Sequence, residues 1–364
     1  MTKKKIIIAT GGTGGHIFPA YSLAKYLNKT GYIVKLTTDN RGLKYLNNYK
    51  ELNLIKIPSS PLLKKNIFKF FFSVSVIIYS IIRSFLFLLF NRPSIVFGMG
   101  GYSSFPICIA ASFLKIKCVV YENNLIIGKA NKILLPYVNK IFVSYKDVHG
   151  IPVKYNEKIL VLGNIIREDI LNSNIEINET KNFEKLIILV LGGSQGAKIF
   201  AEKFPPIFLK LKENKIDIKI YHQCQEKQNV ELTQFYQKNK IDFEIFNFAD
   251  NIIEYYSKVN LVISRSGASV LGELINIKIP FITIPLPSSA DNHQFKNAEF
   301  YKKKGYGYLL EEKNINDELY SLARKIFVNK SLIKNILSNQ RQHSDKNIFK
   351  NLKLKIDEII DEKN

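Results

Sequence analysis

The chain has 364 residues, which is enough for two domains of ordinary size, each with its own hydrophobic core. Its 53 basic and 31 acidic residues give a net charge of +22, which favours anionic partners such as phosphates, nucleic acid or an anionic membrane face, although abundant Lys, Asn and Ile also follow from AT-rich coding. Three cysteines, an odd number in apolar or mixed settings, indicate a reducing compartment, and a basic start followed by only four apolar residues indicates a first strand rather than a signal peptide.

Short apolar runs alternate with helical patterns in the first half, which is typical of a parallel α/β sheet. There we expect strands at 5–9, 32–37, 54–57, 94–98, 117–121 and 140–144. The pattern restarts in the second half, where we expect strands at 186–191, 217–221, 243–246, 260–263 and 280–284. The restart predicts two domains of the same α/β class.

A hinge is expected near 162–168, so the predicted domains are 1–163 and 164–343. The remaining segment, 344–364, is expected to form a last helix that packs back on the first domain. Ser344 and Asp345 are candidate N-cap residues for that helix.

The segment 67–90 is the most apolar stretch of the chain, and its few polar residues fall at helical spacing. It lies at a crossover between two strands of one sheet, so threading it through a bilayer would break that sheet apart. Two interpretations remain open. The helix is either half buried with its remaining apolar surface in a membrane interface, or fully buried in the core. In the first case anionic headgroups would meet Lys64, Lys65, Lys69, Arg83 and Arg92.

Three strand-to-helix corners are rich in glycine. They read Gly11-Gly-Thr-Gly-Gly-His16, Gly98-Met-Gly-Gly-Tyr102 and Gly192-Gly-Ser-Gln-Gly-Ala197. Glycines let backbone N–H groups approach an anion without Cβ obstruction, and the following helix N-terminus adds about half a positive charge. Three such corners, each after an apolar strand, predict two phosphate-bearing ligands.

The first corner also invites comparison with a nicotinamide-dinucleotide site, because Asp39 sits where a ribose-binding acid would. The corner lacks the third glycine of G-x-G-x-x-G, which disfavours that function. A P-loop is disfavoured too, because neither Gly15-His16 nor Gly196-Ala197 supplies the required Gly-Lys-Ser/Thr.

In this order and spacing, the three corners resemble the glycine loops of the bacterial lipid II-forming N-acetylglucosaminyltransferases of peptidoglycan synthesis. Further matches are Glu122-Asn-Asn124, Gly163-Asn164 with Arg167, His222-Gln223, Arg265-Ser-Gly-Ala268, Glu273, Asp291-Asn-His-Gln294 and Asn297-Ala298. The resemblance covers nearly the whole chain, and the motifs together are highly specific.

The resemblance implies a GT-B architecture, in which two Rossmann-like α/β domains with parallel sheets face a cleft. The family moves N-acetylglucosamine from UDP-N-acetylglucosamine to the C4 hydroxyl of muramyl-pentapeptide pyrophosphoryl-undecaprenol (lipid I), with inversion, at the cytoplasmic face of the plasma membrane. The implied partners are therefore both substrates and an anionic membrane surface, reached peripherally, with no nucleic acid and no cofactor. Both substrates carry pyrophosphate, which accounts for the repeated glycine corners.

On this resemblance the second domain holds the donor. Ser194 and the N–H groups of its loop would bind the UDP phosphates, Glu273 the ribose hydroxyls, and Arg167 would add positive charge near the nucleotide. Ala249 falls where the family reads uracil through the backbone, although the family residue is bulkier. The groups matched to sugar contacts are Ala268 and Gln294.

In the first domain, on the acceptor side of the cleft, the resemblance gives Thr13, Gly14, Gly15 and Asn124 as further donor contacts. Its acceptor contacts are Gly100, Gly101 and Tyr102.

An inverting transfer needs one base to take the acceptor hydroxyl proton, and His16 is the candidate because its ordinary pKa of about 6.5 suits that task. The competing interpretation is structural, with the imidazole bonding the loop backbone or a phosphate. Glu122 is a weaker candidate for the base, and we expect it to be a buried hydrogen-bond partner of loop N–H groups. The sequence contains no Asp-x-Asp, so helix N-termini and Arg167 are expected to neutralise the leaving UDP in place of a metal.

Two other functions compete. Another GT-B enzyme, such as a glycolipid synthase or a nucleotide-sugar epimerase, would share the corners, but an epimerase needs no lipid-facing patch such as 67–90. A nucleic-acid-binding protein is suggested by charge alone, without the aromatic and basic interleaving of a known module.

Overall fold

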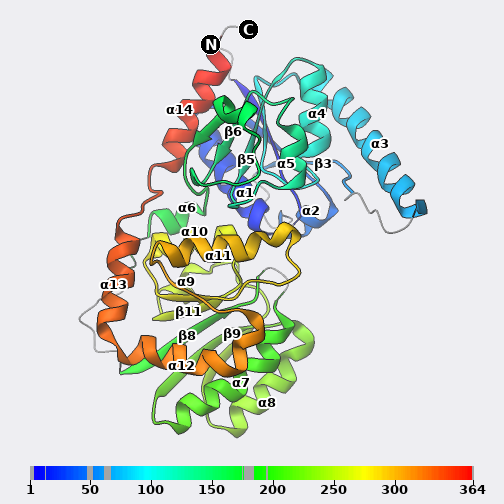
Figure 1. Cartoon of the computed structure of the whole chain (residues 1–364). Coiled ribbons are helices and arrows are strands. Elements are labelled where there is room, and N and C mark those ends of the chain that lie inside the picture. Colours follow the sequence, from blue (N-terminus) through cyan, green and yellow to red (C-terminus); the bar gives the residue numbers. More distant parts are fainter. Residues whose placement is uncertain are drawn as a thin grey trace. The chain divides into compact units, whose positions relative to one another are not determined.

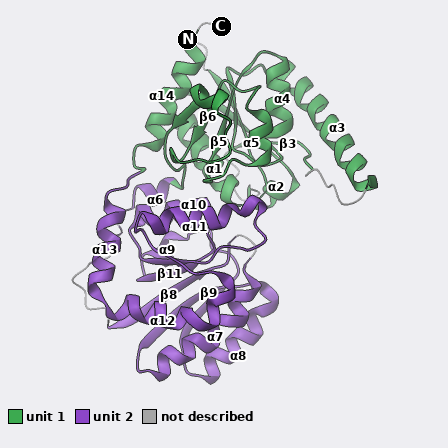
Figure 2. Ribbon diagram, viewed as in Figure 1, with its two compact units in different colours: residues 1–167, 345–364 green, residues 168–344 purple. Residues whose placement is uncertain are grey.

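The computed structural model describes residues 4–12, 14–46, 52–60, 67–173, 175, 184–193 and 196–362. They form two compact units (Figure 2). Unit 1 comprises Met1–Arg167 with Asp345–Asn364, and unit 2 comprises Glu168–Ser344. Residues 164–167, which the sequence analysis places in the second domain, therefore belong to unit 1.

Unit 1 is built on a sheet that, in the described part of the chain, has seven strands with every neighbouring pair parallel (Figure 1). Their spatial order is β3-β2-β1-β4-β5-β6-β7. The strands are β1 (Lys5–Ala9), β2 (Ile33–Thr38), β3 (Asn53–Lys56), β4 (Ile95–Gly98), β5 (Lys117–Glu122), β6 (Lys140–Val143) and β7 (Ile159–Val161). The helices are α1 (Gly14–Lys29), α2 (Asn40–Leu46), α3 (Ile67–Asn91), α4 (Phe105–Phe113), α5 (Lys129–Leu134) and α14 (Ile348–Asp361).

Unit 2 repeats the plan with six parallel strands among its described residues, in the order β10-β9-β8-β11-β12-β13. The strands are β8 (Lys185–Leu191), β9 (Asp217–Gln223), β10 (Asp242–Phe246), β11 (Leu261–Ser264), β12 (Phe281–Thr283) and β13 (Tyr308–Leu309). The helices are α6 (Glu168–Leu171), α7 (Lys198–Glu213), α8 (Asn229–Lys238), α9 (Ile253–Tyr256), α10 (Ala268–Ile277), α11 (His293–Lys303), α12 (Ile315–Val328) and α13 (Lys330–Arg341). Both units thus have the strand order of a Rossmann fold, and the predicted α/β class is confirmed.

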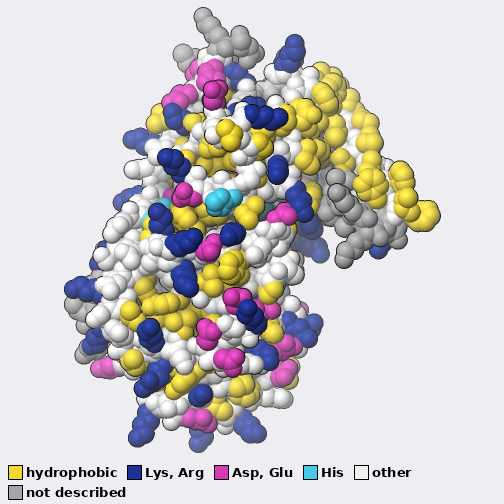
Figure 3. Space-filling model, viewed as in Figure 1, with side chains coloured by type: hydrophobic (Ala, Val, Ile, Leu, Met, Phe, Trp, Pro, Cys, Tyr) yellow, Lys and Arg dark blue, Asp and Glu magenta, His cyan; other side chains and the backbone are white. Residues whose placement is uncertain are grey.

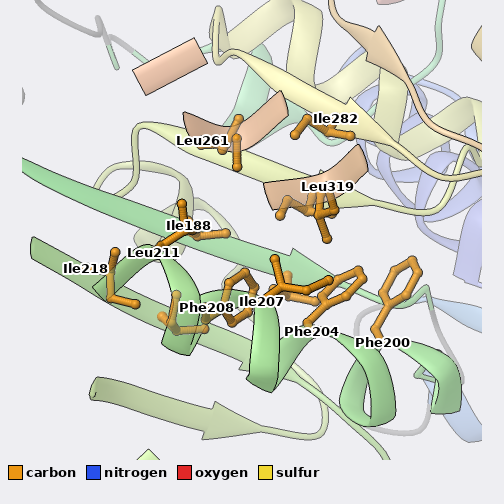
Figure 4. Close-up of a cluster of buried hydrophobic side chains, with 14 of the residues drawn as sticks. Ile188, Phe200, Phe204, Ile207, Phe208, Leu211, Ile218, Leu261, Ile282 and Leu319 are labelled. Atoms are coloured by element: carbon orange, nitrogen blue, oxygen red, sulfur yellow. The ribbon is translucent and has the colours of Figure 1, made fainter. Parts of the chain in front are cut away.

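The central strands are apolar along almost their whole length because both of their faces are covered. All four residues of β4 and β11 are buried, as are the last four of β1. In unit 2 the core gathers around α7, whose Phe200 and Phe204 rings stack with centroids 4.5 Å apart (Figure 4).

All eleven predicted strands are present, and β7 and β13 were missed. Both are edge strands, so neither is buried on two faces. They are also short, β7 with three residues and β13 with two, so each gives too little sequence to show a strand pattern.

The orientation of helix α3 is unexpected, because three of its serines are buried while many of its large apolar side chains are exposed. It packs on α4, and its buried residues are Ser73, Ser80, Ser84 and Leu88. Its exposed large apolar side chains are Ile67, Phe68, Phe71, Phe72, Ile78, Tyr79, Ile82, Leu86, Leu89 and Phe90. Figure 3 shows them as the continuous apolar surface at the upper right. The interpretation of 67–90 as a fully buried helix is therefore wrong.

By length and composition alone, α3 is the one helix of the described chain that is long and apolar enough to cross a membrane. It nevertheless joins β3 to β4 within one sheet and packs on α4, as the crossover argument expects.

The C-terminal helix α14 completes unit 1 by packing against α1. The Tyr26 and Phe349 rings stack with centroids 5.2 Å apart, and the Lys117 ammonium donates to the carbonyl of Ile359 at 2.7 Å. This lysine occupies the carboxyl end of the helix, where a positive charge is favourable.

The predicted N-cap of this helix is wrong. The helix begins at Ile348, with Asn347 at its N-cap. The Asp345 carboxylate instead accepts the backbone N–H of Asn164 at 3.0 Å and the side-chain amide of Asn164 at 2.9 Å. Asp345, where the chain re-enters unit 1, therefore bonds Asn164, close to the point where the chain leaves that unit.

Candidate active site

Each sheet reverses its chain order at one point, between β1 and β4 in unit 1 and between β8 and β11 in unit 2. In open parallel sheets, ligands bind beyond the carboxyl ends of the strands at such a switch point. The first two glycine corners follow β1 and β4, and the third follows β8, with the Arg265-Ser-Gly-Ala268 segment after β11. We call residues 10–16 with 98–103 the unit 1 half-site, and residues 192–197 with 265–268 the unit 2 half-site.

In the unit 1 half-site the two glycine corners touch each other. A Cβ on Gly11 would overlap the side chain of Ser103, so only glycine allows this approach. A Cβ on Gly100, whose φ is +87°, would lie 3.4 Å from Cε1 of His16, so the imidazole lies against the second corner. The structure therefore brings His16, at the start of α1, together with Gly100.

Other predicted residues of the first domain fall in the same place. Gly14 and Gly15 form the first turn of α1, so their N–H groups lie at the helix N-terminus. Gly101 packs near Gly11 and His16, and the side chain of Tyr102 is partly exposed beside it. Thr13 lies outside the described residues.

Glu122 is a buried carboxylate at the end of β5 that holds the following loop. Its Oε1 accepts the backbone N–H of Asn124 at 3.0 Å and the Asn124 side-chain amide at 2.9 Å. Its Oε2 accepts the N–H of Gly128 at 2.8 Å and the amide of Asn131 at 3.0 Å. Four donors on two oxygens support the interpretation of Glu122 as a partner of loop N–H groups, and Asn124 is thereby fixed in place.

Asp39 plays a comparable structural part after β2. Its oxygens accept hydrogen bonds from the N–H of Gly42 at 2.9 Å, from Nε and Nη2 of Arg41 at 3.0 and 2.8 Å, and from Ser59 at 2.8 Å. Burial alone would raise the pKa of Asp39, but the hydrogen bonds from Gly42, Arg41 and Ser59 and the charge of Arg41 bring it below the ordinary value. A carboxylate so occupied is poorly placed to read a ribose, which removes the remaining support for a dinucleotide site.

Arg167 is the last residue of unit 1 and stacks on the first helix. Its guanidinium carbon lies 4.1 Å from the centroid of the Phe18 ring, two residues after His16 in α1. The stacking fixes the planar group on an aromatic face. The sequence motif identified Arg167 but gave no sign of Phe18 as its partner.

In the unit 2 half-site the third glycine corner closes tightly on itself. A Cβ on Gly192 would overlap the backbone N of Ala197, so the corner requires glycine there. The N–H of Gly192 donates to the Gln223 side-chain oxygen at 3.0 Å. The described part of the corner leads directly into α7, whose N-terminal N–H groups lie at a position where an anion could bind. Ser194 itself lies outside the described residues.

The other predicted donor residues lie around the same edge. Glu273 is half buried in α10, where its Oε2 accepts the Tyr256 hydroxyl at 3.0 Å. Ala268 is the first residue of that helix, and Ala249 is in the loop after β10. Gln294, near the start of α11, accepts the backbone N–H of Leu286 at 2.9 Å. Tyr256, which no motif indicated, sets the orientation of Glu273.

Two residues before α11 adopt the left-handed conformation. Asp291 has φ +50° and Asn292 φ +55°, a region that costs energy for residues with a Cβ but that Asp and Asn tolerate best. The segment leads into His293 and Gln294, and the Nδ1–H of His293 donates to the carbonyl of Ala290 at 2.7 Å. The strained turn leads into α11, which reaches the unit 2 half-site at Asn297, whose side-chain amide donates to the carbonyl of Ser266 at 3.2 Å.

Arg265 is a structural residue in this arrangement. Its guanidinium pairs with Glu312 at 2.5 Å and donates to the carbonyls of Ile284 and Pro285 at 3.3 and 3.2 Å. It therefore braces the segment after β11 against the loop after β12.

His222, one of the residues that carry the family resemblance, is buried in the core of unit 2 and has a structural role there. Its Nδ1 bonds the Tyr236 hydroxyl at 2.8 Å, and the ring lies near Phe204 and Phe208. Burial lowers the pKa of His222 to about 3, so the imidazole is neutral at pH 7.

Among the residues described, no group of three or more His, Cys, Asp or Glu side chains is placed to hold a metal ion.

Two Rossmann-like units with anion-binding corners at their switch points define the GT-B class of sugar-nucleotide enzymes. The crystal structure of Acinetobacter baumannii MurG has this fold and superposes with a TM-score of 0.75, at 23% identity, over 98% of this chain and 99% of that one.

The sequence matches the N-terminal domain of glycosyltransferase family 28 over residues 6–143 and the C-terminal domain of that family over residues 187–353. The chain belongs to glycosyltransferase family 28. A relative in Pelagibacter ubique is 36% identical over 99% of both chains, and one in Rickettsia felis is 40% identical over 89% of this chain and 90% of its own. Each of these relatives is named UDP-N-acetylglucosamine–N-acetylmuramyl-(pentapeptide) pyrophosphoryl-undecaprenol N-acetylglucosamine transferase.

The buried His222 predicts a particular dependence of stability on pH. The unfolded chain takes up a proton at this histidine below about pH 6.5, whereas the folded chain does so only near pH 3, so stability falls as pH falls through that window. Replacing His222 by Gln removes this contribution. The difference in unfolding free energy between wild type and variant should therefore shrink by about 2 kcal/mol from pH 7 to pH 5. Urea unfolding followed by far-UV circular dichroism measures it, since the chain has no Trp. A constant difference would contradict the neutral, buried imidazole.

Proposed function

We propose that this chain transfers N-acetylglucosamine from UDP-N-acetylglucosamine to the C4 hydroxyl of the muramyl sugar of lipid I, forming lipid II for peptidoglycan. The observation that carries the proposal is the pair of Rossmann-like units with glycine corners at their switch points. The relatives named as N-acetylglucosamine transferases, which match nearly the whole chain, support it. Because both substrates carry a pyrophosphate, each unit has one diphosphate to hold.

The donor belongs to unit 2. The corner after β8 and the N-terminus of α7 bind the UDP diphosphate, with Ser194 as a further contact. Glu273, oriented by Tyr256, accepts hydrogen bonds from the ribose hydroxyls. The backbone at Ala249 reads uracil, and the sugar meets Ala268 and Gln294.

The acceptor belongs to unit 1, where Gly100, Gly101 and Tyr102 contact it. Thr13, Gly14, Gly15 and Asn124 reach the donor sugar from the same unit. The packing of the two corners against each other supports a shared ligand position, because His16 already lies against Gly100.

The reaction is a single displacement with inversion. The C4 hydroxyl oxygen of the acceptor forms a bond to C1 of N-acetylglucosamine as the bond from C1 to the UDP oxygen breaks, and His16 takes the hydroxyl proton. The negative charge that develops on UDP is met by N–H groups at the N-termini of α7 and α10 and by Arg167.

The transfer is tested with a short-chain lipid I analogue and radiolabelled UDP-N-acetylglucosamine, which should yield a labelled disaccharide. His16→Ala should lower kcat on the order of 100-fold or more, because the hydroxyl proton loses its acceptor, while the KM for the donor changes little. His343→Ala in unit 2 is the control. Wild-type turnover in His16→Ala would rule out the base, and isomerised UDP-sugar without acceptor would identify an epimerase instead.

The role of Glu273 is tested by calorimetry. Glu273→Ala should weaken UDP binding about 10- to 100-fold, because charge-assisted bonds to the ribose are lost, and it should bind UDP and 2′-deoxy-UDP almost equally. Glu254→Ala, which removes the same charge from α9, should bind UDP like the wild type. Retained preference for the ribonucleotide in Glu273→Ala would contradict the assignment.

The exposed apolar side of α3 supports peripheral attachment at the cytoplasmic face of the plasma membrane. Ten large apolar side chains of α3 are exposed, far more than a water-facing helix usually carries. The exposed Lys69, Arg83 and Arg92 lie on or next to this helix and would meet anionic headgroups, whereas Lys64 and Lys65 lie outside the described residues. The inward serines leave the apolar side free to enter the interface without loss of packing on α4.

Sedimentation with phosphatidylglycerol-containing vesicles tests this attachment. Replacing Phe68, Phe71 and Phe72 by Ser should lower the partition coefficient at least about tenfold, because three large apolar side chains no longer leave water. The control replaces three equally exposed apolar residues elsewhere, Val153, Val230 and Val328, and should leave partitioning unchanged. Equal effects of the two variants would argue against α3 as the membrane face.

A further inference from the structure

The end of strand β9 connects the two segments of unit 2 to which the proposed function assigns the donor nucleotide. In the sheet, β9 lies between β8 and β10. The glycine corner follows β8, and the segment with Phe248 and Ala249 follows β10. The last residue of β9 is Gln223, and its side chain is 6% exposed.

The side-chain amide of Gln223 bonds both neighbouring segments at once. Its oxygen accepts the backbone N–H of Gly192 at 3.0 Å, and its nitrogen donates to the backbone carbonyl of Asn247 at 3.3 Å. Gly192 is the first residue after β8, and Asn247 is the first residue after β10. One buried side chain therefore spans three adjacent strand ends just where the backbone ladder stops.

The residues that follow Gln223 reinforce both sides of this bridge. The Gln225 side-chain amide donates to the carbonyl of Gly196 at 3.2 Å, at the far end of the glycine corner. The Asn247 amide donates in turn to the carbonyl of Cys224 at 2.9 Å. The extension of β9 thus holds the corner at both ends and the neighbouring segment at its start.

We propose that Gln223 is a positioning residue for the donor nucleotide, which sets the spacing between the diphosphate-binding corner after β8 and the uracil-binding segment after β10. The inference rests on the proposed function. Within one UDP molecule the base and the diphosphate are joined by a ribose, so both segments must be held at matching positions before the ligand arrives. Both polar groups of the Gln223 amide are used by the backbone, so Gln223 acts through these segments and not by touching the ligand.

Calorimetric titration with UDP and with uridine tests the proposal. Gln223→Met has nearly the same shape but bonds neither segment, so its affinity for UDP should fall about tenfold, with a smaller loss for uridine, which spans only one segment. Gln223→Glu keeps an acceptor for Gly192 but places a second oxygen against the Asn247 carbonyl, so it should also reduce the preference for UDP over uridine. In the transfer assay the KM for the donor should rise in both variants, with kcat changing less.

The matched control is Gln340→Met. Gln340 is another fully buried glutamine of unit 2, and its amide donates to the carbonyls of Ile279 and Tyr306 at 3.0 and 2.7 Å. This variant should lose stability yet keep the wild-type ratio of UDP to uridine affinity, a ratio that simple destabilisation does not change.

An unchanged ratio in both Gln223 variants, or an equal fall in Gln340→Met, would overturn the positioning role while leaving the proposed function intact. A wild-type chain that does not bind UDP would overturn the proposed function, and this inference with it. Circular dichroism establishes that each variant is folded, and either Gln223 variant alone suffices for the comparison.

Discussion

Glycine at positions where a Cβ would not fit is the constraint on which both half-sites depend. At Gly11 the neighbouring corner is so close that any Cβ would overlap Ser103, and at Gly192 the corner folds back onto Ala197. Such contacts leave N–H groups at the carboxyl edge of a parallel sheet, where a diphosphate can approach them. Side chains around these corners hold the backbone: Asp39 accepts the N–H of Gly12 in unit 1, and Gln223 accepts the N–H of Gly192 in unit 2.

Much of this arrangement could be predicted because it follows from local rules. A strand buried on both faces must be apolar throughout, and a corner that approaches an anion must lack Cβ atoms, so the central strands and the three corners were visible in the sequence. The short strands β7 and β13 were not, because two or three residues are too few to show a pattern. The Asp345 side chain was misread as a helix cap, because an aspartate before a helix is the usual signal and its true partner, Asn164, is distant in the sequence.

The orientation of α3 illustrates a different limit. Serines at helical spacing mark one stripe of the helix, but the pattern alone does not say whether that stripe faces water or protein. In most surface helices the polar stripe faces water. Here three of the serines are buried and ten large apolar side chains are exposed, which is the arrangement expected where the surrounding medium is itself apolar. Similarly, His222 and Gln223 are consecutive polar residues, but successive side chains of a strand point to opposite faces of the sheet. His222 is therefore buried in the core, whereas Gln223 is the last residue of β9 and bonds the segments beside it.

The hydrogen bonds between Asn164 and Asp345 also bear on how the chain folds. Unit 2 is continuous in the sequence, whereas unit 1 is interrupted by it and is completed only by α14. During synthesis the ribosome releases unit 2 whole before the last helix emerges, so unit 2 has every residue it needs to fold first. Unit 1 is complete only once α14 packs on α1 and Asp345 bonds Asn164, which joins the two ends of its interrupted chain.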